Sequence, residues 1–192
     1  MSEIILASAS PRRAELLDQI GVCYQVQVVD IDESPLEREA AEQLVKRLAI
    51  EKSQAIDSAN IPVLGADTLG VIDNRLLVKP QNYEHAHEML SCMSGSWHEI
   101  LSAVAISYED KTDVALNKNN VLFRCITDDE IKSYWQTSEP QDKAGAYAIQ
   151  GLAALFIERI EGSYSGIMGL PLFETAQLLS KFNIQTWRSS QE

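Results

Sequence analysis

The sequence predicts an α/β fold on three observations. Short apolar strands alternate with amphipathic helices, and the second of these helices is followed by a strand hairpin. At 192 residues the chain is long enough to bury about 70% of its unfolded surface. We therefore expect a single domain over residues 1–192, built as two lobes around a cleft, which needs no disulfide or metal to fold.

The first strand and helix are predicted to meet at a tight loop. Ile4 to Ala7 are all apolar and form a short buried strand. Ser10 is a good N-cap and Pro11 a good first helical residue, because proline lacks the N–H that would be unpaired there. Gly21 then ends the helix.

Two arginines in the first turn of this helix conflict with that prediction. Arg12 and Arg13 place positive charge where the helix dipole disfavours it by about 0.3–1 kcal/mol each. A phosphate bound to the free N–H groups, with the Ser8 and Ser10 hydroxyls beside it, would remove the conflict. The alternative is that both arginines point into water.

The next segment ends in a run of carboxylates. Tyr24, Val26 and Val28 alternate with glutamines, which is typical of a half-exposed strand. In the acidic run that follows, Asp30 and Asp32 are interpreted as a solvated loop. Glu33 is a candidate ligand for a hard cation such as Mg²⁺.

A long amphipathic helix is predicted from Leu36 to about Ile56. Stepping 100° per residue places Lys52 in the middle of its apolar stripe. Either Lys52 buries its stem and carries the amine out to water, or it presents a functional amine to a cleft.

A hairpin is predicted over Val63–Ile72 and Leu76–Pro80, with a turn at Asp73 and Asn74. Asp67 is a carboxylate within an otherwise apolar strand, and burying it without a partner is too costly to persist. It is either functional or a structural group satisfied by neighbouring N–H donors. Lys79 leaves the same hairpin and is a second cation that could meet it.

Glycines beside this aspartate, Gly65 and Gly70, leave room for close approach to the backbone. Further along the chain, Gln150 stands between an isoleucine and a glycine. Its amide offers both a donor and an acceptor, and so suits a pyrimidine edge that carries a carbonyl beside an N–H.

The remaining elements are predicted as scaffold. The predicted helices cover Tyr83–Met93, the segment after the capping box at Thr127, and the segment after Pro171, where Phe173 lies on the inner side. Strands are predicted over Ile100–Ile106, over Thr112–Cys125 as one or two strands broken around Asn117–Asn120, and over Leu152–Ile160. Residues 188–192 are predicted to form a loose tail.

Composition excludes several classes of function. The net charge of −12 repels a polyanion, and with no basic stripe in the sequence we expect no nucleic-acid partner. Three cysteines without paired spacing indicate neither a disulfide framework nor a zinc site, and favour a reducing compartment. Without a signal-like start or a membrane-spanning run, we expect a cytoplasmic protein with no membrane partner.

Several motifs together resemble the Maf family of nucleoside triphosphate pyrophosphatases almost from end to end. They are Ser8-Ala9-Ser10-Pro11-Arg12-Arg13, Asp32-Glu33, Lys52, Gly65-Ala66-Asp67-Thr68, Lys79-Pro80, Asp142 to Gly151, and Gly169-Leu170-Pro171. The resemblance implies an elongated mixed β-sheet with flanking helices, related to inosine triphosphatase-like proteins, with the site in a cleft between two lobes.

The resemblance also implies an activity: hydrolysis of a nucleoside triphosphate to the monophosphate and pyrophosphate, with a divalent cation, Mg²⁺ or Mn²⁺. Arg12 after Pro11, Thr68 after Asp67, and Gln150 before Gly151 are similar to the dTTP/UTP branch. The alternatives are a nucleotide-binding regulator of cell division without turnover, or a pyrophosphatase for 7-methyl-GTP or ITP. A homodimer is allowed by the resemblance alone.

The resulting hypothesis assigns roles to the candidate site residues. Asp67 orients or deprotonates the attacking water, and the metal bridges the triphosphate to Glu33 and Asp67. The substrate-binding candidates are Ser8, Arg12, Arg13, Lys52 and Lys79 for the triphosphate, and Thr68 and Gln150 for the uracil or thymine edge.

Overall fold

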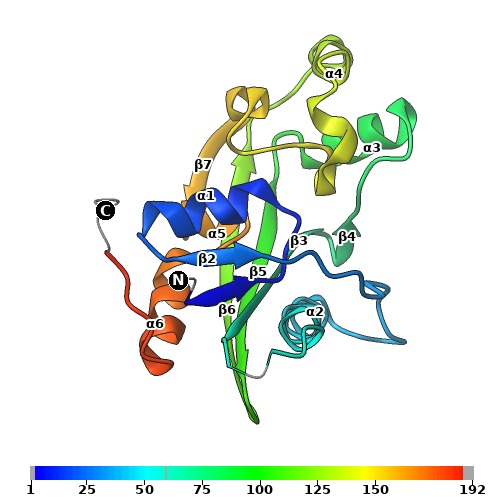
Figure 1. The fold of residues 1–192 in the computed structure, drawn as a ribbon. Coiled ribbons are helices and arrows are strands. Elements are labelled where there is room, and N and C mark those ends of the chain that lie inside the picture. The colour runs from blue at the N-terminus through cyan, green and yellow to red at the C-terminus, as the bar shows by residue number, and fades with distance from the viewer. Residues whose placement is uncertain (1–2, 59, 188–192) are drawn as a thin grey trace. The chain divides into compact units, whose positions relative to one another are not determined.

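The computed structural model describes residues 3–58 and 60–187 and shows an α/β fold with a mixed sheet and flanking helices (Figure 1). The strand order is β2-β1-β3-β5-β6-β7, with β4 paired to β3. Strand β1 is parallel to β2 and β3, whereas β3–β4 and β6–β7 are antiparallel. The strands are β1 Ile4–Leu6, β2 Tyr24–Val26, β3 Val63–Ile72, β4 Arg75–Leu77, β5 Trp97–Tyr108, β6 Lys111–Phe123 and β7 Ile157–Glu161.

The helices fall between and after these strands. They are α1 Pro11–Gln19, α2 Ala41–Gln54, α3 Tyr83–Met93, α4 Asp128–Trp135, α5 Tyr164–Met168 and α6 Leu172–Lys181, with short 3₁₀ turns at Glu139–Asp142, Ala144–Ala146 and Leu152–Leu155. The predicted alternation of strands and helices is therefore confirmed.

The chain divides into two compact units. The first unit contains the described residues of Met1–Thr68, Ser102–Asn117 and Gly169–Glu192, and the second unit contains Leu69–Leu101 and Lys118–Met168. Strands β3, β5 and β6 each contribute residues to both.

In the first unit, the backbone of helix α2 packs closely against strand β3. Leu44, Val45 and Leu48 bury the inner face of α2. A Cβ atom added at Gly65 would collide with the backbone of Ala49 and Ser53. Only glycine therefore permits this contact between helix and strand.

In the second unit, the core contains a cluster of aromatic rings. The rings of His98, Phe123 and Tyr147 pack edge to face, with centroids 4.9–5.4 Å apart. Phe156 adds a fourth ring, 6.1 Å from Phe123. The His98 imidazole is only 2% exposed, and its Nε2 lies 2.8 Å from the Tyr147 hydroxyl.

Most predicted elements are confirmed, including the hairpin with its turn at Asp73–Asn74, helix α3 and the capping box of α4. The predicted start of the second helix, at Leu36, is wrong. Helix α2 begins at Ala41, because Arg38 has a positive φ of 60° and Glu39 turns back to accept from the Leu36 N–H at 3.0 Å.

Three predictions further along the chain are also wrong. Strand β6 is not broken at its asparagines, because buried Asn119 bonds the Ile100 carbonyl and the Ser163 N–H. Leu152–Leu155 forms a 3₁₀ turn capped by the Glu139 carboxylate, so β7 starts only at Ile157. Phe173 is 70% exposed rather than inward. The predicted loose tail lies outside the described residues.

Candidate functional site

The first candidate group lies at the start of α1 in the first unit. Ser10 occupies the N-cap position and Pro11 follows it, as predicted, but the Ser10 side chain makes no capping bond. The Ser8 hydroxyl instead accepts from the Ser10 N–H and from Arg13 Nη1, both at 3.1 Å. Buried Ser8 therefore joins the loop backbone to one of the two arginines.

Arg13 is held at a second point as well. Its Nε donates to the Gly169 carbonyl at 2.9 Å, which fixes the guanidinium between the first strand's loop and the residue before the Leu170-Pro171 pair. Arg12 is half-buried and adds a second positive charge beside it. No acidic residue occupies the first turn of α1, so the unfavourable placement of two cations there is confirmed.

The second candidate group is an ion triad formed by Lys52, Asp67 and Glu33. Lys52 Nζ donates to Asp67 Oδ1 and to Glu33 Oε1, in each case at 2.6 Å. The Asp67 side chain is 8% exposed and that of Lys52 10%, whereas that of Glu33 is 60% exposed. The lysine in the helix stripe and the aspartate in the apolar strand are thus partners.

Local sequence explains why this pair forms. Residues i and i+2 of a strand face the same side, so Asp67 points to the side on which Gly65 admits helix α2. Lys52 lies between Ala49 and Ser53, the two residues against which Gly65 packs. The glycine therefore brings the lysine within reach of the carboxylate two residues further along.

Electrostatics link the two groups. Burial raises the pKa of Asp67 above its ordinary value, although the positive charges of Lys52 and Arg13 oppose the rise. Burial lowers the pKa of Arg13, and the charges of Asp67 and Glu33 oppose that change. A carboxylate with a raised pKa is a stronger base than an ordinary aspartate.

A hydroxyl pair includes Thr68, the residue that follows Asp67 in strand β3. Thr68 Oγ1 and Ser102 Oγ are 2.9 Å apart, and the Ser102 side chain is fully buried. A Cβ added at Gly169, where φ is +117°, would lie 3.5 Å from Thr68 Oγ1 and 3.7 Å from Arg13 Nε. The proposed base-reading threonine and the proposed phosphate-binding arginine thus share one glycine neighbour.

Lys79 and Gln150 belong to the second unit, and both are exposed. The segment before Lys79 pairs with the loop that leads to Gln150, because the Gly145 N–H donates to the Val78 carbonyl at 3.0 Å. Within the first unit, hydrogen bonds join Ser8 to Arg13 and join Lys52 to Glu33 and Asp67, and the charge of Arg13 influences Asp67. Arg12 and Thr68 belong to the same unit, whereas Lys79 and Gln150 belong to the second.

The carboxylates of the ion triad fit a metal that is shared with a substrate. Asp67 Oδ2 is buried and has no hydrogen-bond partner, so one oxygen of this buried carboxylate remains to be satisfied. In the described part of the chain no group of three or more His, Cys, Asp or Glu could hold a metal by itself. Mg²⁺ commonly binds through one or two carboxylates together with substrate phosphates.

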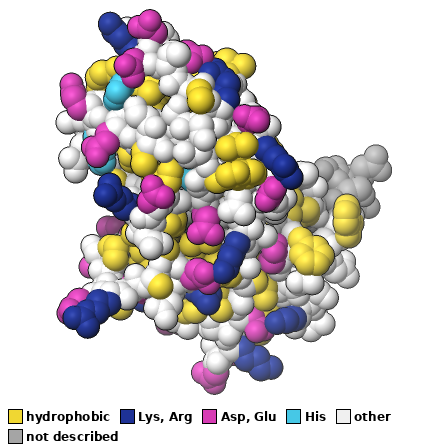
Figure 2. Space-filling view, turned by 180° about the vertical axis from the view of Figure 1, so that it is seen from behind, with side chains coloured by type: hydrophobic (Ala, Val, Ile, Leu, Met, Phe, Trp, Pro, Cys, Tyr) yellow, Lys and Arg dark blue, Asp and Glu magenta, His cyan; other side chains and the backbone are white. Residues whose placement is uncertain are grey.

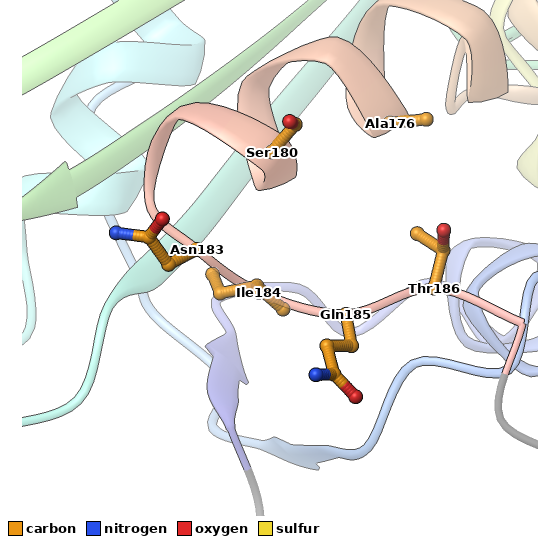
Figure 3. Close-up of a pocket in the computed structure, with 6 residues that line it drawn as sticks. All are labelled: Ala176, Ser180, Asn183, Ile184, Gln185 and Thr186. Carbon is orange, nitrogen blue, oxygen red and sulfur yellow. The ribbon is translucent and has the colours of Figure 1, made fainter.

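A surface pocket elsewhere in the first unit lacks this chemistry. It lies between the end of α6 and the segment after it, and is lined by Ala176, Ser180, Asn183, Ile184, Gln185 and Thr186 (Figure 3). None of these side chains is charged, so the pocket offers nothing to balance a triphosphate.

On the face shown in Figure 2, basic side chains lie dispersed among acidic ones in the described part of the chain. Such a face offers no continuous track for a nucleic-acid backbone. Among the described residues, no helix is both long and apolar enough to cross a membrane.

Sequence reasoning missed three contributors to the site. It did not identify the Gly169 carbonyl as the acceptor for Arg13, the Ser102 hydroxyl beside Thr68, or the pairing of Glu33 with Lys52. Only the charges of Glu33 and Lys52 gave a signal. A backbone carbonyl and a buried serine carry none.

Comparison with known proteins identifies the family of this chain. The profile of the family described as Maf-like protein matches residues 3–182. The dTTP/UTP pyrophosphatase of Methylobacillus flagellatus is 52% identical over 183 residues, 93% of this chain and 92% of that protein. The dTTP/UTP pyrophosphatase of Alkalilimnicola ehrlichii is 50% identical, over 96% of this chain and 95% of that protein. That of Shigella dysenteriae is 46% identical, over 95% of this chain and 94% of that protein. The chain belongs to the Maf-like protein family.

Proposed function

We propose that this protein is a nucleoside triphosphate pyrophosphatase that hydrolyses dTTP and UTP to the monophosphate and pyrophosphate. The observation that carries the proposal is the buried Lys52–Asp67 pair with Arg13 close enough to influence it. A carboxylate beside two cations is what water attack on a triphosphate requires, since it combines a base with charge stabilisation. The names of the relatives support the choice of nucleotides.

In this mechanism the Asp67 carboxylate accepts the proton of the attacking water. The water oxygen bonds to the α-phosphorus, and the bond to the bridging oxygen breaks to release pyrophosphate. Arg13 and Lys52 stabilise the negative charge that accumulates on the leaving oxygens. Glu33 and Asp67 would hold a divalent cation, which supplies further charge neutralisation when bound.

The remaining predicted residues complete the proposal. Ser8 and Arg12 bind phosphate oxygens beside Arg13, and Lys79 contributes a further cation. Thr68 and Gln150 select the uracil or thymine edge through hydrogen bonds. We also propose that the enzyme works in the cytoplasm as a guard of the nucleotide pool, without nucleic-acid or membrane partners. We further propose a homodimer, which sedimentation of the protein tests.

Pyrophosphate release from dTTP, UTP, CTP, 7-methyl-GTP and ITP, each with Mg²⁺ or Mn²⁺ and with the metal chelated, tests the proposal. We expect turnover of dTTP and UTP that is lost on chelation. Preferred turnover of 7-methyl-GTP or ITP would replace the substrate assignment. Tight nucleotide binding with no pyrophosphate from any of the five would instead indicate a regulator without turnover.

A further inference from the structure

Glu33 lies in a segment that has no regular structure of its own. Residues 27–40 contain neither helix nor strand, and the Glu33 side chain is 60% exposed. Ordering such a segment costs about 1–2 kcal/mol per residue in backbone entropy alone. Some other contact must therefore hold the Glu33 backbone where its carboxylate reaches Lys52.

Arg47 makes that contact from helix α2. Its Nη2 donates to the Ser34 carbonyl at 3.0 Å, directly after Glu33. Its Nε and Nη2 also fork onto the two carboxylate oxygens of Glu39, at 2.7 and 2.9 Å. The Glu39 carboxylate in turn accepts from the Leu36 N–H at 3.0 Å. One guanidinium thus holds the segment at two points after Glu33.

The forked contact between Arg47 and Glu39 is partly buried. The side chain of Arg47 is 20% exposed and that of Glu39 only 8%. A forked arginine–carboxylate pair that is partly removed from water is stronger than an ordinary surface ion pair. The Arg47 guanidinium lowers the pKa of Glu39 to about 2, so the carboxylate stays charged throughout the physiological range.

We propose that Arg47 is a positioning residue that latches the segment carrying Glu33 onto helix α2, and so presets the carboxylate arrangement for the divalent cation. Lys52, five residues further along the same helix, binds Glu33 and Asp67. The helix therefore both holds the segment and carries the cation to which Glu33 is aimed. The role toward the metal rests on the proposed function, whereas the latch does not.

The test compares three variants, because Arg47 has one partner outside the segment. Arg47→Ala and Glu39→Ala break the latch from its two sides. Glu51→Ala is the matched control, since it removes only the carboxylate that Arg47 Nη1 contacts at 3.0 Å within helix α2. Thermal unfolding first establishes that each variant folds; should Arg47→Ala fail to fold, Glu39→Ala carries the same test.

Two readouts separate positioning from general stability. In hydrogen exchange followed by mass spectrometry, we expect faster exchange confined to residues 30–39 in Arg47→Ala and Glu39→Ala. In Mg²⁺ titrations of pyrophosphate release, we expect the half-saturating Mg²⁺ concentration to rise about tenfold, as for loss of one charged hydrogen bond. kcat at saturating Mg²⁺ should stay near that of the unaltered protein, and Glu51→Ala should change neither readout.

Two further variants sharpen the result. The double variant Arg47→Ala/Glu39→Ala should show the same Mg²⁺ affinity and the same hydrogen exchange as either single variant, because both substitutions remove the same latch. Arg47→Lys should recover only part of the Mg²⁺ affinity, since an ammonium cannot fork onto a carboxylate. Equal exchange in Arg47→Ala and Glu51→Ala, or a loss of kcat at unchanged Mg²⁺ affinity, would overturn the proposal.

A wild-type protein without turnover would contradict the proposed function but not the latch. In that case hydrogen exchange over residues 30–39 and calorimetric Mn²⁺ binding by the same variants in their nucleotide-bound form decide the inference. Weaker Mn²⁺ binding together with faster exchange in both latch variants supports it. Unchanged Mn²⁺ binding or unchanged exchange rejects it.

Discussion

At the scale of single residues, the ion triad is what distinguishes this chain from an ordinary α/β scaffold. Lys52 donates to two carboxylates at 2.6 Å, and both members of its pair with Asp67 are largely removed from water. Such a pair is weak evidence for added stability, because desolvation offsets much of its attraction. Its presence within an apolar helix stripe and an apolar strand is better explained by function.

Breaking one half of this pair should be costly. Lys52→Met leaves the buried Asp67 carboxylate without its cation, and we expect a loss of about 3–5 kcal/mol in unfolding free energy. The double variant Lys52→Met/Asp67→Asn removes both charges and should recover much of that loss. Urea unfolding of the two variants measures this; a double variant no more stable than Lys52→Met would show that the charge imbalance is not the cause.

His98 predicts a specific dependence of stability on pH. Burial lowers the pKa of His98 to about 4 in the folded protein, against 6.5 for an unperturbed histidine. Between these values the unfolded chain takes up a proton that the folded protein does not, so stability falls as the pH drops from 6.5 toward 4. The loss is on the order of 3 kcal/mol.

The control is His98→Gln, which keeps a polar group for the Tyr147 hydroxyl but does not titrate. Unfolding free energies of both proteins, measured at several pH values from 7 to 4, should converge as the pH falls. Parallel curves would mean that His98 is not the group responsible.

At the scale of elements, the contact between helix α2 and strand β3 creates the site. The contact depends on Gly65, whose missing side chain lets the strand lie against the Ala49 carbonyl and the Ser53 N–H. The helix carries both Lys52 and Arg47, so its height above the strand sets the position of two cations at once.

Gly65→Ala should therefore damage stability and site together. The added methyl group meets backbone atoms that cannot turn away, and we expect destabilisation of at least about 2 kcal/mol with loss of nucleotide binding. Gly70→Ala is a milder comparison on the same strand, because its methyl group would meet side-chain atoms of Leu77 rather than backbone atoms. Thermal unfolding and nucleotide titration check both; equal effects of the two variants would contradict the account.

Sequence alone predicted the elements whose signals are local. The Asp73–Asn74 turn, the capping box at Thr127 and the strand–helix corner at Pro11 each depend on residues near in sequence, and all are present. Asp67 and Lys52 were visible because each is a charged residue at an apolar position.

The errors come from contacts that are distant in sequence. Helix α2 begins late because Glu39 pairs with Arg47, and the strand expected from Leu152 gives way to a 3₁₀ turn because the Glu139 carboxylate binds its N–H groups. Strand β6 continues through its asparagines because Asn119 finds partners on both sides. No pattern within these segments indicates such partners.

At the scale of the whole molecule, a net charge of −12 and a cluster of cations are compatible because they act over different ranges. Mobile ions screen the net charge beyond about 10 Å in ordinary salt. Lys52 is largely buried and Arg13 partly buried beside their partners, where screening is weak. A small anion gains from these few cations, whereas a polymer meets the repulsive remainder.

The charge distribution gives a prediction about partners. At protein concentrations high enough to saturate UTP binding, we expect no measurable binding of duplex DNA or single-stranded RNA at about 0.15 M salt. Fluorescence anisotropy with labelled oligonucleotides measures this. A rise in anisotropy on adding protein, with an affinity that falls steeply as the salt concentration increases, would reveal a basic track. That result would contradict the prediction.

The central claim is that the buried Asp67 carboxylate, paired with Lys52 and influenced by the charge of Arg13, activates water for attack on a triphosphate. Asp67→Asn keeps the shape and removes the basic oxygen. Pyrophosphate release from UTP by this variant, with UTP binding measured in parallel, tests the claim most directly. We predict a fall of about 10²–10⁴-fold in kcat with nucleotide binding retained; turnover near that of the unaltered protein would contradict it.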